Sequence, residues 1–304
     1  MKKSKKIIGR KNALIFYSLW MIVPMLHFAI FYVGVNFNSI ILAFKVYDYE
    51  LDRYVFTFRN FADFFRDLFT YDVLGVVFKN SLVLYFWGAV IGVSFALVFA
   101  FYIYKKFIGS GFFKVVLFLP SIISSMAMAL IFLVFADVAI PDLVRSVTGK
   151  ELTGLMIIGS DTVFPTIIFY NIWISFGIAM LMYSSAMSRI PEDIIEYSKI
   201  DGVSYARELF GITIPLIGST LQTFIVVGIA GNFTNQANVL AFFPTTEDRN
   251  IQTIGFYLFS SVSRGMVSKY PYLAAGGLIF TLLTFPLTFG MQLLLSKIIP
   301  EVEY

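Results

Sequence analysis

The sequence predicts an all-α, polytopic membrane protein with six transmembrane helices and both termini in the cytoplasm. Three observations carry this prediction. Apolar residues make up 58% of the chain and charged residues 14%, whereas soluble domains average about 45–50% and about 25%. Uncharged runs of about 20 residues, enough to cross a bilayer, recur along the chain. Lysine and arginine gather on one side of these runs, as they do in cytoplasmic loops.

Six segments with little or no charge form the expected spans. A basic stretch precedes the first segment, as in a signal peptide. A signal peptide has an apolar core of only about 7–15 residues, however, and no small-residue cleavage site follows Trp20–Phe31. We therefore expect a retained first span and a single transmembrane domain over residues 13–299. The expected spans cover approximately residues 13–44, 77–104, 113–136, 162–188, 212–236 and 271–296.

The distribution of charge sets the expected orientation. A basic tail over residues 1–12 holds six positive charges and no acidic residue, which places the N-terminus in the cytoplasm. The rest of the chain carries 17 basic and 19 acidic residues. The net charge of +4 therefore reflects membrane topology, not a surface that binds nucleic acid. Further basic residues mark the cytoplasmic side after spans two, four and six: Lys105, Lys106, Lys114, Arg189, Lys199, Arg207 and Lys297.

Composition also excludes several kinds of site. The chain has no cysteine and one histidine, which rules out thiol catalysis, disulfides and a zinc site of His and Cys ligands. It has no phosphate-binding G-x-x-x-x-G-K-[ST] loop, since Gly149-Lys150 is followed by glutamate and lacks the upstream pattern. An intramembrane enzyme would need paired acids or a Ser/His dyad, but only Asp137 lies near a span interior and His27 lacks an evident partner. We predict no catalytic residue, no metal site and no bound cofactor.

Residues 189–211, on the expected cytoplasmic side, have the pattern of two short helices. Pro191 suits the first turn of a helix, and the two acidic residues after it suit the positive end of the helix dipole. Gly202 fits a C-terminal cap, and Ser204 can begin a second helix. From these features alone, the segment could simply be a helical hairpin that covers the ends of the spans.

The same segment resembles the EAA loop of membrane subunits of ATP-binding-cassette importers. The family pattern is E-A-A, three residues, G, nine residues, then I-x-L-P. This sequence has Glu196-Tyr197-Ser198, Gly202 and Ile212-Thr213-Ile214-Pro215 at the same spacing. Tyrosine and serine stand in place of the two alanines, and isoleucine in place of leucine. The flanking Ile190-Pro191-Glu192-Asp193 and Asp201-Gly202 are similar to the maltose-type sugar permeases.

The resemblance spans residues 14–297, with its specific part at 173–238, and implies a type I ABC importer permease fold in a bacterial cell membrane. It implies that the loop docks on a cytoplasmic ATPase dimer, which binds the ATP. Further implied partners are a second homologous permease, giving a heterodimer, an extracellular or lipid-anchored sugar-binding protein, and membrane lipid, but no nucleic acid. The implied ATPase-coupling residues are Pro191, Glu192, Asp193, Glu196, Ser198, Asp201 and Gly202.

Polar residues cluster in the fourth and fifth spans, where they usually face a watery cavity or the bundle interior. Asn232, Asn235 and Gln236 are spaced to share one helical face. Carboxamides donate and accept hydrogen bonds, which suits sugar hydroxyls, although interhelical bonding is an equally good account. Asn232-Phe233-Thr234-Asn235 resembles the N-F-x-N segment that lines the sugar site in maltose-type subunits. With neighbouring positions of the preceding span, the predicted substrate-binding residues are Asn171, Trp173, Gly177, Ile178, Gly231, Asn232, Asn235 and Gln236.

Gly231 and Ile178 are smaller than the aromatics common at these positions in the family. Either the cavity is wide enough for an oligosaccharide, or the partner permease holds the sugar. The predicted function is the permease subunit of an ATP-driven sugar or oligosaccharide importer that works by alternating access. The alternatives are an importer of a peptide, amino acid or anion, and a channel or scaffold that works without an ATPase. On the outer side, Arg59–Phe69 predicts an amphipathic helix, and residues 250–263 predict an interfacial helix or a folded loop.

Overall fold

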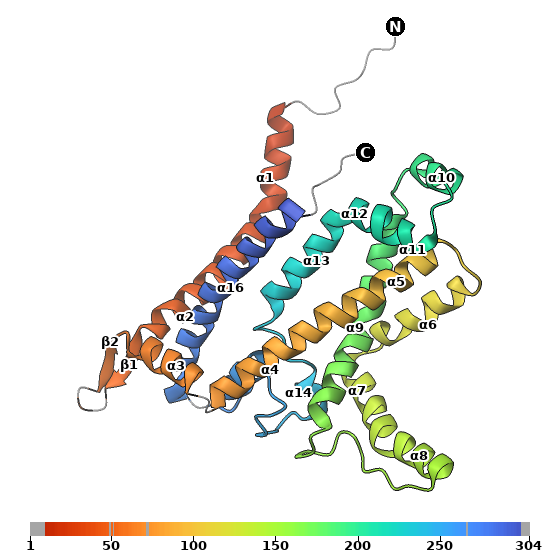
Figure 1. The fold of residues 1–304 in the computed structure, drawn as a ribbon. Helices are drawn as coiled ribbons and strands as arrows, with labels where there is room; N and C mark the ends of the chain where they lie inside the picture. The colour runs from red at the N-terminus through yellow and green to blue at the C-terminus, as the bar shows by residue number, and fades with distance from the viewer. Residues whose placement is uncertain (1–9, 49, 51, 71–72, 266, 299–304) are drawn as a thin grey trace. The chain divides into compact units, whose positions relative to one another are not determined.

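The computed structural model describes residues 10–48, 50, 52–70, 73–265 and 267–298. The chain is predominantly helical, as predicted (Figure 1). Most of the predicted basic tail, residues 1–12, lies outside the described residues. The chain divides into two compact units. The first comprises Met1–Phe65 with Gly265–Ile279, and the second comprises Arg66–Arg264 with Phe280–Tyr304.

The first unit contains the first predicted span and a small element of two strands and a helix. Helices α1 (Arg10–His27), η1 (Phe28–Gly34) and α2 (Val35–Ala43) follow one another without a break. Strands β1 (Lys45–Asp48) and β2 (Arg53–Phe56) then pair antiparallel, an addition to the all-helical prediction. Helix α3 has the bounds predicted for the amphipathic helix, Arg59–Phe69.

Side chains of α3 hold this unit together. The Asn60 carboxamide donates to the carbonyl oxygens of Ala43 and Lys45, each at 2.9 Å, which joins α3 to the start of the hairpin. Phe64 is fully buried, with its ring 5.1 Å from that of Tyr272. One side of α3 is therefore covered by protein, whereas Phe65 and Phe69 remain exposed.

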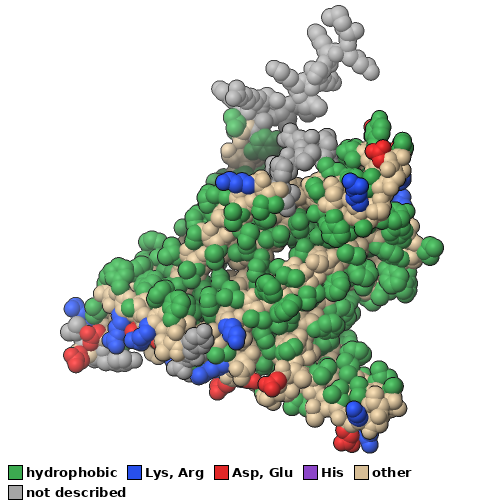
Figure 2. All heavy atoms as spheres, viewed as in Figure 1, with side chains coloured by type: hydrophobic (Ala, Val, Ile, Leu, Met, Phe, Trp, Pro, Cys, Tyr) green, Lys and Arg blue, Asp and Glu red, His purple; other side chains and the backbone are tan. Residues whose placement is uncertain are grey.

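The second unit holds the second to fifth spans and the larger part of the sixth, from Phe280 onward. Helices α4 (Val73–Trp87), η2 (Gly88–Gly92) and α5 (Val93–Tyr104) form the second span, and α9 (Val163–Met187) forms the fourth. Helix α16 (Tyr270–Ile298), which begins after the 3₁₀ turn η5 (Val267–Lys269), forms the sixth. Five helices of the described chain are long and apolar enough to cross a membrane, and a sixth is obtained if one bent pair counts as a single span. Hydrophobic side chains cover much of the face shown in Figure 2.

The predicted third span, residues 113–136, is interrupted. Helix α6 (Ser110–Ile122) ends where Ile123 becomes extended, with ψ 144°. Ser124 then begins α7 (Ser125–Val134) by accepting the Ala127 N–H at 3.4 Å. The helix continues through η3 (Phe135–Ala139) and α8 (Ile140–Thr148), so the membrane-spanning candidate lies at Ser125–Thr148 instead.

The predicted fifth span, residues 212–236, is both bent and shorter. Helices α12 (Ile214–Leu216) and α13 (Gly218–Gly231) meet at a bend of 72°. Helix α13 ends at Gly231, and Ala237 and Asn238 take positive φ angles of 53° and 56°. The prediction that Asn232, Asn235 and Gln236 share one helical face is therefore wrong, because the helix ends at Gly231, before all three residues.

The outer segment after this turn is folded onto the second span. It contains α14 (Val239–Phe242) and α15 (Ile254–Ser263). The Asn80 carboxamide of α4 donates to the carbonyls of Arg249, Asn250 and Gln252 at 2.9–3.0 Å. The Ser81 hydroxyl accepts the N–H of Ile254, which begins α15 and is fully buried. Residues 250–263 thus form part of a folded loop, the second of the two predicted options.

Helices α6 and α9 approach at backbone contact. A Cβ atom on Gly177 would overlap the carbonyl oxygen of Leu117 and would lie 3.0 Å from the Cα of Phe118. Both obstacles are backbone atoms, which cannot rotate away. Only glycine at position 177 allows this spacing.

Asn80→Ala should lower the stability of the purified protein by about 1–3 kcal/mol, because the carbonyls of Arg249, Asn250 and Gln252 lose their buried donor. The measurement is thermal unfolding in detergent, with hydrogen exchange of residues 246–254 as the local readout. Asn36→Ala is the matched control, since Asn36 donates to one carbonyl of its own helix. Equal melting shifts in the two variants would contradict this account of the outer loop.

Gly177→Ala should destabilise the protein by about 1–3 kcal/mol through overpacking of α6 against α9. Gly290→Ala in α16 is the control, because a Cβ there meets nothing within 4 Å. Alanine is the better helix former, so the control should keep or raise the melting temperature. If Gly177→Ala melts at or above the temperature of the control, then α6 and α9 can move apart with little loss of stability, which would contradict this account.

Candidate functional site

A cavity of about 270 Å³ lies among the second, fourth and fifth spans. Helices α4, η2 and α5 form one wall, and α9 and α13 form the others. Three of the predicted substrate-binding residues, all asparagines, line it together. The lining residues are Leu84, Tyr85, Gly88, Ala89, Gly92, Val93, Asn171, Ile172, Ser175, Phe176, Ala179, Tyr183, Phe224, Ile225, Gly228, Asn232 and Asn235.

The three asparagines differ in how far they are already engaged. Asn171 donates to the carbonyls of Ile167 and Ala237, each at 2.8 Å, and accepts from Asn238 at 2.8 Å. Both of its N–H groups are therefore used within the protein. Asn235 accepts the N–H of Ala237 at 2.8 Å through its side-chain oxygen. Asn171 and Asn235 shape the turn after α13 as well as line the cavity.

Asn232 is the carboxamide best placed to bind a ligand. It is 7% exposed, lines the cavity, and has no side-chain hydrogen bond to the described part of the chain. Because no protein group is bonded to this carboxamide, a solute or water in the cavity can take up its hydrogen bonds. The cavity therefore has at least one polar group available to a solute.

The rest of the lining is uncharged. Among the described residues, no Asp, Glu, Lys or Arg lines this cavity. Aromatic rings contribute apolar surface, and Gly88, Gly92 and Gly228 leave room along two walls. A Cβ atom at Gly228 would lie 3.0 Å from the Tyr85 ring, so glycine keeps α13 close to α4. This surface suits a neutral solute with both polar and apolar faces.

The other predicted substrate-binding residues lie elsewhere. Gly177 packs against α6, and Trp173 lines a second cavity of about 810 Å³ with aliphatic and aromatic neighbours. Ile178 is 49% exposed and lines neither cavity. Gly231 ends α13, and Gln236 lies in the turn that follows it. The structure therefore does not bring all eight predicted residues together in one site.

Tyr85, with the small residues near it, was missed by the sequence interpretation. Tyr85 donates to the Ile225 carbonyl at 3.2 Å and so links α4 to α13. Tyr85, Gly88, Ala89 and Gly92 recur at intervals that place them on one side of a helix. That stripe of small residues was the signal available in the sequence.

The predicted coupling segment folds as a capped helical pair. Helix α10 (Glu192–Ile200) is followed by α11 (Tyr205–Glu208) and η4 (Leu209–Thr213). Val203 N–H donates to the Ser198 carbonyl at 3.0 Å, and Gly202 N–H donates to the Lys199 carbonyl at 3.1 Å. With φ +69° at Gly202, these bonds make a Schellman motif. The glycine cap is as predicted, whereas Pro191 is the N-cap and α10 begins one residue after it.

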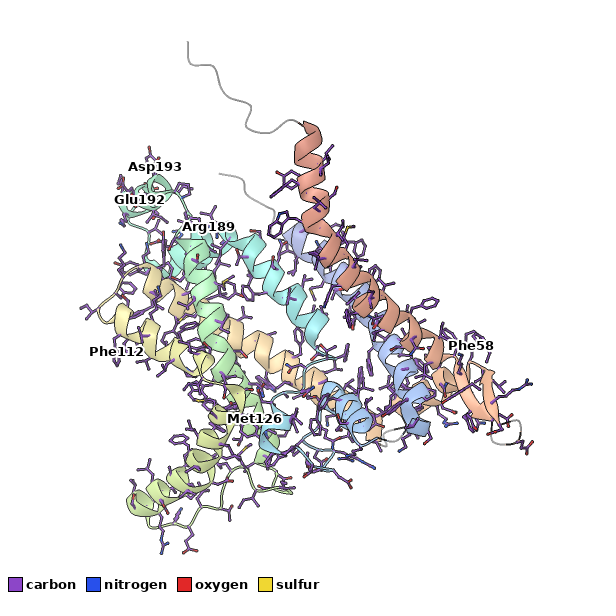
Figure 3. The ribbon with its side chains drawn as sticks, turned by 180° about the vertical axis from the view of Figure 1, so that it is seen from behind. Phe58, Phe112, Met126, Arg189, Glu192 and Asp193 are labelled. Carbon is purple, nitrogen blue, oxygen red and sulfur yellow. The ribbon has the colours of Figure 1, made fainter. Side chains whose placement is uncertain are left out.

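This coupling segment has two distinct faces. Ile195 and Ser198 are buried, and the Ser198 hydroxyl donates to the Ile195 carbonyl at 2.8 Å. The opposite face is exposed, and Figure 3 labels its first two acids, Glu192 and Asp193, on α10. Ser198 therefore faces this protein rather than a partner. Five of the residues predicted to couple to the ATPase are exposed: Glu192, Asp193, Glu196, Asp201 and Gly202.

The buried face joins the segment to the spans. Ile190, Ile195 and Leu209 belong to one buried cluster with side chains of α5, α9 and the start of α13. Helix α11 is capped by Ser204, as predicted, through the Arg207 N–H at 3.5 Å. The segment is thus a compact, self-capped element packed on the ends of several helices, and displacing it must displace them.

Within the described residues, no group of three or more His, Asp or Glu side chains is arranged to hold a metal ion. Asp137 instead accepts the Met156 N–H at 2.7 Å and fixes the loop after α8.

Comparison with known proteins identifies relatives and a shared fold. The probable ABC transporter permease protein YurN of Bacillus subtilis is 25% identical over 219 residues, which cover 70% of this chain and 74% of YurN. The diacetylchitobiose uptake system permease protein NgcF of Streptomyces coelicolor is 27% identical over 132 residues, 40% of this chain and 36% of NgcF. A chain of the bacterial alginate ABC transporter, crystallised in complex with an alginate pentasaccharide-bound periplasmic protein, superposes with a TM-score of 0.79. It is 18% identical, with 96% of this chain and 98% of that chain covered.

The family model described as "binding-protein-dependent transport system inner membrane component" matches residues 88–300. That match covers the coupling segment, the last span and all the cavity-lining residues except Leu84 and Tyr85. The superposition shows the type I importer fold. The chain therefore belongs to the binding-protein-dependent transport system inner membrane component family, the membrane permease subunits of ABC importers, and is a transport subunit rather than an enzyme.

Proposed function

We propose that this chain is the permease subunit of an ATP-driven importer of neutral sugars or oligosaccharides. The cavity lined by Asn171, Asn232 and Asn235 is its substrate site. The observation that carries the substrate class is the lining of this cavity, which combines carboxamides and aromatic rings with no charged side chain among the described residues. Family membership supports import; the substrate and the coupling to ATP hydrolysis are the proposal.

The chemistry of the lining favours saccharides over other solutes. Asn232 offers a donor and an acceptor to vicinal hydroxyls. Tyr85, Phe176 and Phe224 offer apolar surface to the C–H faces of a sugar ring. An anion or an amino acid would call for a buried countercharge, since an unpaired charge in such a site is costly. NgcF, named for the uptake of a disaccharide, is a relative consistent with this class.

The coupling segment supports the proposal that ATP hydrolysis occurs on a partner. Its exposed face carries four acids on a rigid, capped element, and the chain itself has no phosphate-binding loop. A cytoplasmic ATPase dimer would receive this face. A second homologous permease would complete the pathway as a heterodimer, and a sugar-binding protein would deliver the solute from outside. The cavity then opens alternately to the two sides of the membrane.

Asn232→Ala should raise the substrate concentration needed for half-maximal uptake by about tenfold, because a net hydrogen bond of about 1–1.5 kcal/mol to the sugar is lost. Uptake of a labelled neutral oligosaccharide into proteoliposomes measures this. Asn250→Ala, an exposed asparagine outside the cavity, is the matched control. Unchanged uptake kinetics in Asn232→Ala, with normal assembly, would reject this cavity as the substrate site.

Reversing the charge of the exposed coupling face should abolish uptake while the permease still inserts and folds. Glu196→Lys and Asp201→Lys each place a like charge where an ATPase surface complementary to acids is expected, which costs several kcal/mol. The measurement is ATP-driven uptake together with co-purification of the ATPase. Glu151→Lys, an exposed acid outside the segment, should behave as wild type. Persistent uptake and co-purification in both charge reversals would disprove docking at this face.

A further inference from the structure

The turn between α5 and α6 touches the coupling segment at two points. The Lys105 ammonium forms an ion pair with the carboxylate of Glu208, the last residue of α11. The Phe107 ring packs edge-on against Tyr205, the first residue of α11, with ring centroids 5.2 Å apart. Both ends of α11 are therefore fastened to one turn that lies far away in the sequence.

The ion pair is removed from solvent. The side chains of Lys105 and Glu208 are 9% and 3% exposed. The ammonium also lies 5.5 Å from the ring centroids of both Phe101 and Tyr104, within the range of a cation–π contact. The lysine is thus held by a carboxylate and by two rings of its own helix.

Stability alone gives no reason for this pair. Removing two charges from water costs several kcal/mol each, and apolar residues of similar volume often serve the fold as well or better. In some proteins a buried polar or ionic group instead fixes the register between two elements. Here it fixes α11 relative to the end of α5.

The turn that carries Lys105 is itself stiff. The Lys105 N–H donates to the Phe101 carbonyl at 2.9 Å, and the Ser110 N–H donates to the Phe107 carbonyl at 2.9 Å. Lys106 and Gly109 take positive φ angles of 53° and 80°, which reverse the chain within a few residues. A displacement of Lys105 must therefore carry both α5 and α6.

We propose that the Lys105–Glu208 pair is a positioning element that passes movement of the coupling segment to α5 and α6. The chain already links this segment to α9 and α12. The pair adds α5, the last part of the second span, and helix α6, and α5 leads directly into the wall of the proposed substrate cavity. This inference rests on the proposed ATPase-coupled import. It names the contact through which movement of the coupling segment would reach α5 and α6, which are not connected to the segment along the chain.

The test is the number of ATP molecules hydrolysed per solute imported, measured on the complete transporter in proteoliposomes. Lys105→Met/Glu208→Met removes both charges and keeps apolar volume, so assembly is expected. ATP consumed per solute should rise at least about fivefold, the lower end of typical coupling energies. The exchange Lys105→Glu/Glu208→Lys restores the pair in reverse and should bring the ratio back toward wild type. Lys106→Met, at the exposed neighbouring residue, is the matched control.

A double methionine variant that assembles and keeps the wild-type ratio would overturn the proposal. If that variant does not assemble, Glu208→Gln decides, because it removes the charge but retains an acceptor for Lys105. A wild-type ratio in Glu208→Gln overturns the proposal in the same way. Failure of the underlying function looks different. In that case Glu196→Lys would also leave uptake unchanged, whereas failure of the contact alone leaves Glu196→Lys inactive and the Lys105 and Glu208 variants normal.

Discussion

The constraint on which this structure depends is that backbone polar groups within a bilayer must find partners inside the protein. Continuous helices meet it for most of the spans. Where a helix of a span stops early, as α13 does, side chains supply the missing partners. After α13 ends, Asn171 and Asn235 bond the Ala237 carbonyl and N–H. Asn232 lies in the same turn and lines the cavity. Asn171 and Asn235 therefore both satisfy the backbone where the helix ends and contribute to the polar lining.

The close packing of α9 gives this arrangement its rigidity. Gly177 brings the α6 backbone against α9, while residues one turn earlier line the cavity and the end of the helix enters the coupling segment. Helix α9 therefore contacts the cavity, helix α6 and the coupling segment. Since packed interfaces respond by switching between discrete arrangements rather than by stretching, movement at one end of α9 has few ways to be absorbed before it reaches the other.

Much of the fold and part of the site followed from the sequence, for physical reasons that differ by element. The spans could be predicted because charged residues are excluded from lipid. The coupling segment could be predicted because its helix caps require Gly202 and Ser204 at fixed positions. The turn after Gly231 was not visible, because periodicity continues through Asn235 and Gln236 and nothing local shows that Ala237 takes a positive φ. Gly177 was assigned to the solute from its neighbours, whereas its role depends on the Leu117 backbone. Contacts such as Lys105–Glu208 join distant segments, which a single sequence does not reveal.

The Schellman turn at Gly202 and the Ser204 cap close the coupling segment with bonds from its own residues. None of the exposed acids Glu192, Glu196 or Asp201 supplies a side-chain bond to these caps. The outward face is therefore free to vary while the fold beneath it stays the same. Under the proposed function, the residues that would dock the ATPase are separate from those that would bind the solute, so one set can be exchanged without rebuilding the other. A permease of this design could be moved between ATPases by rewriting a few surface positions on one short helix.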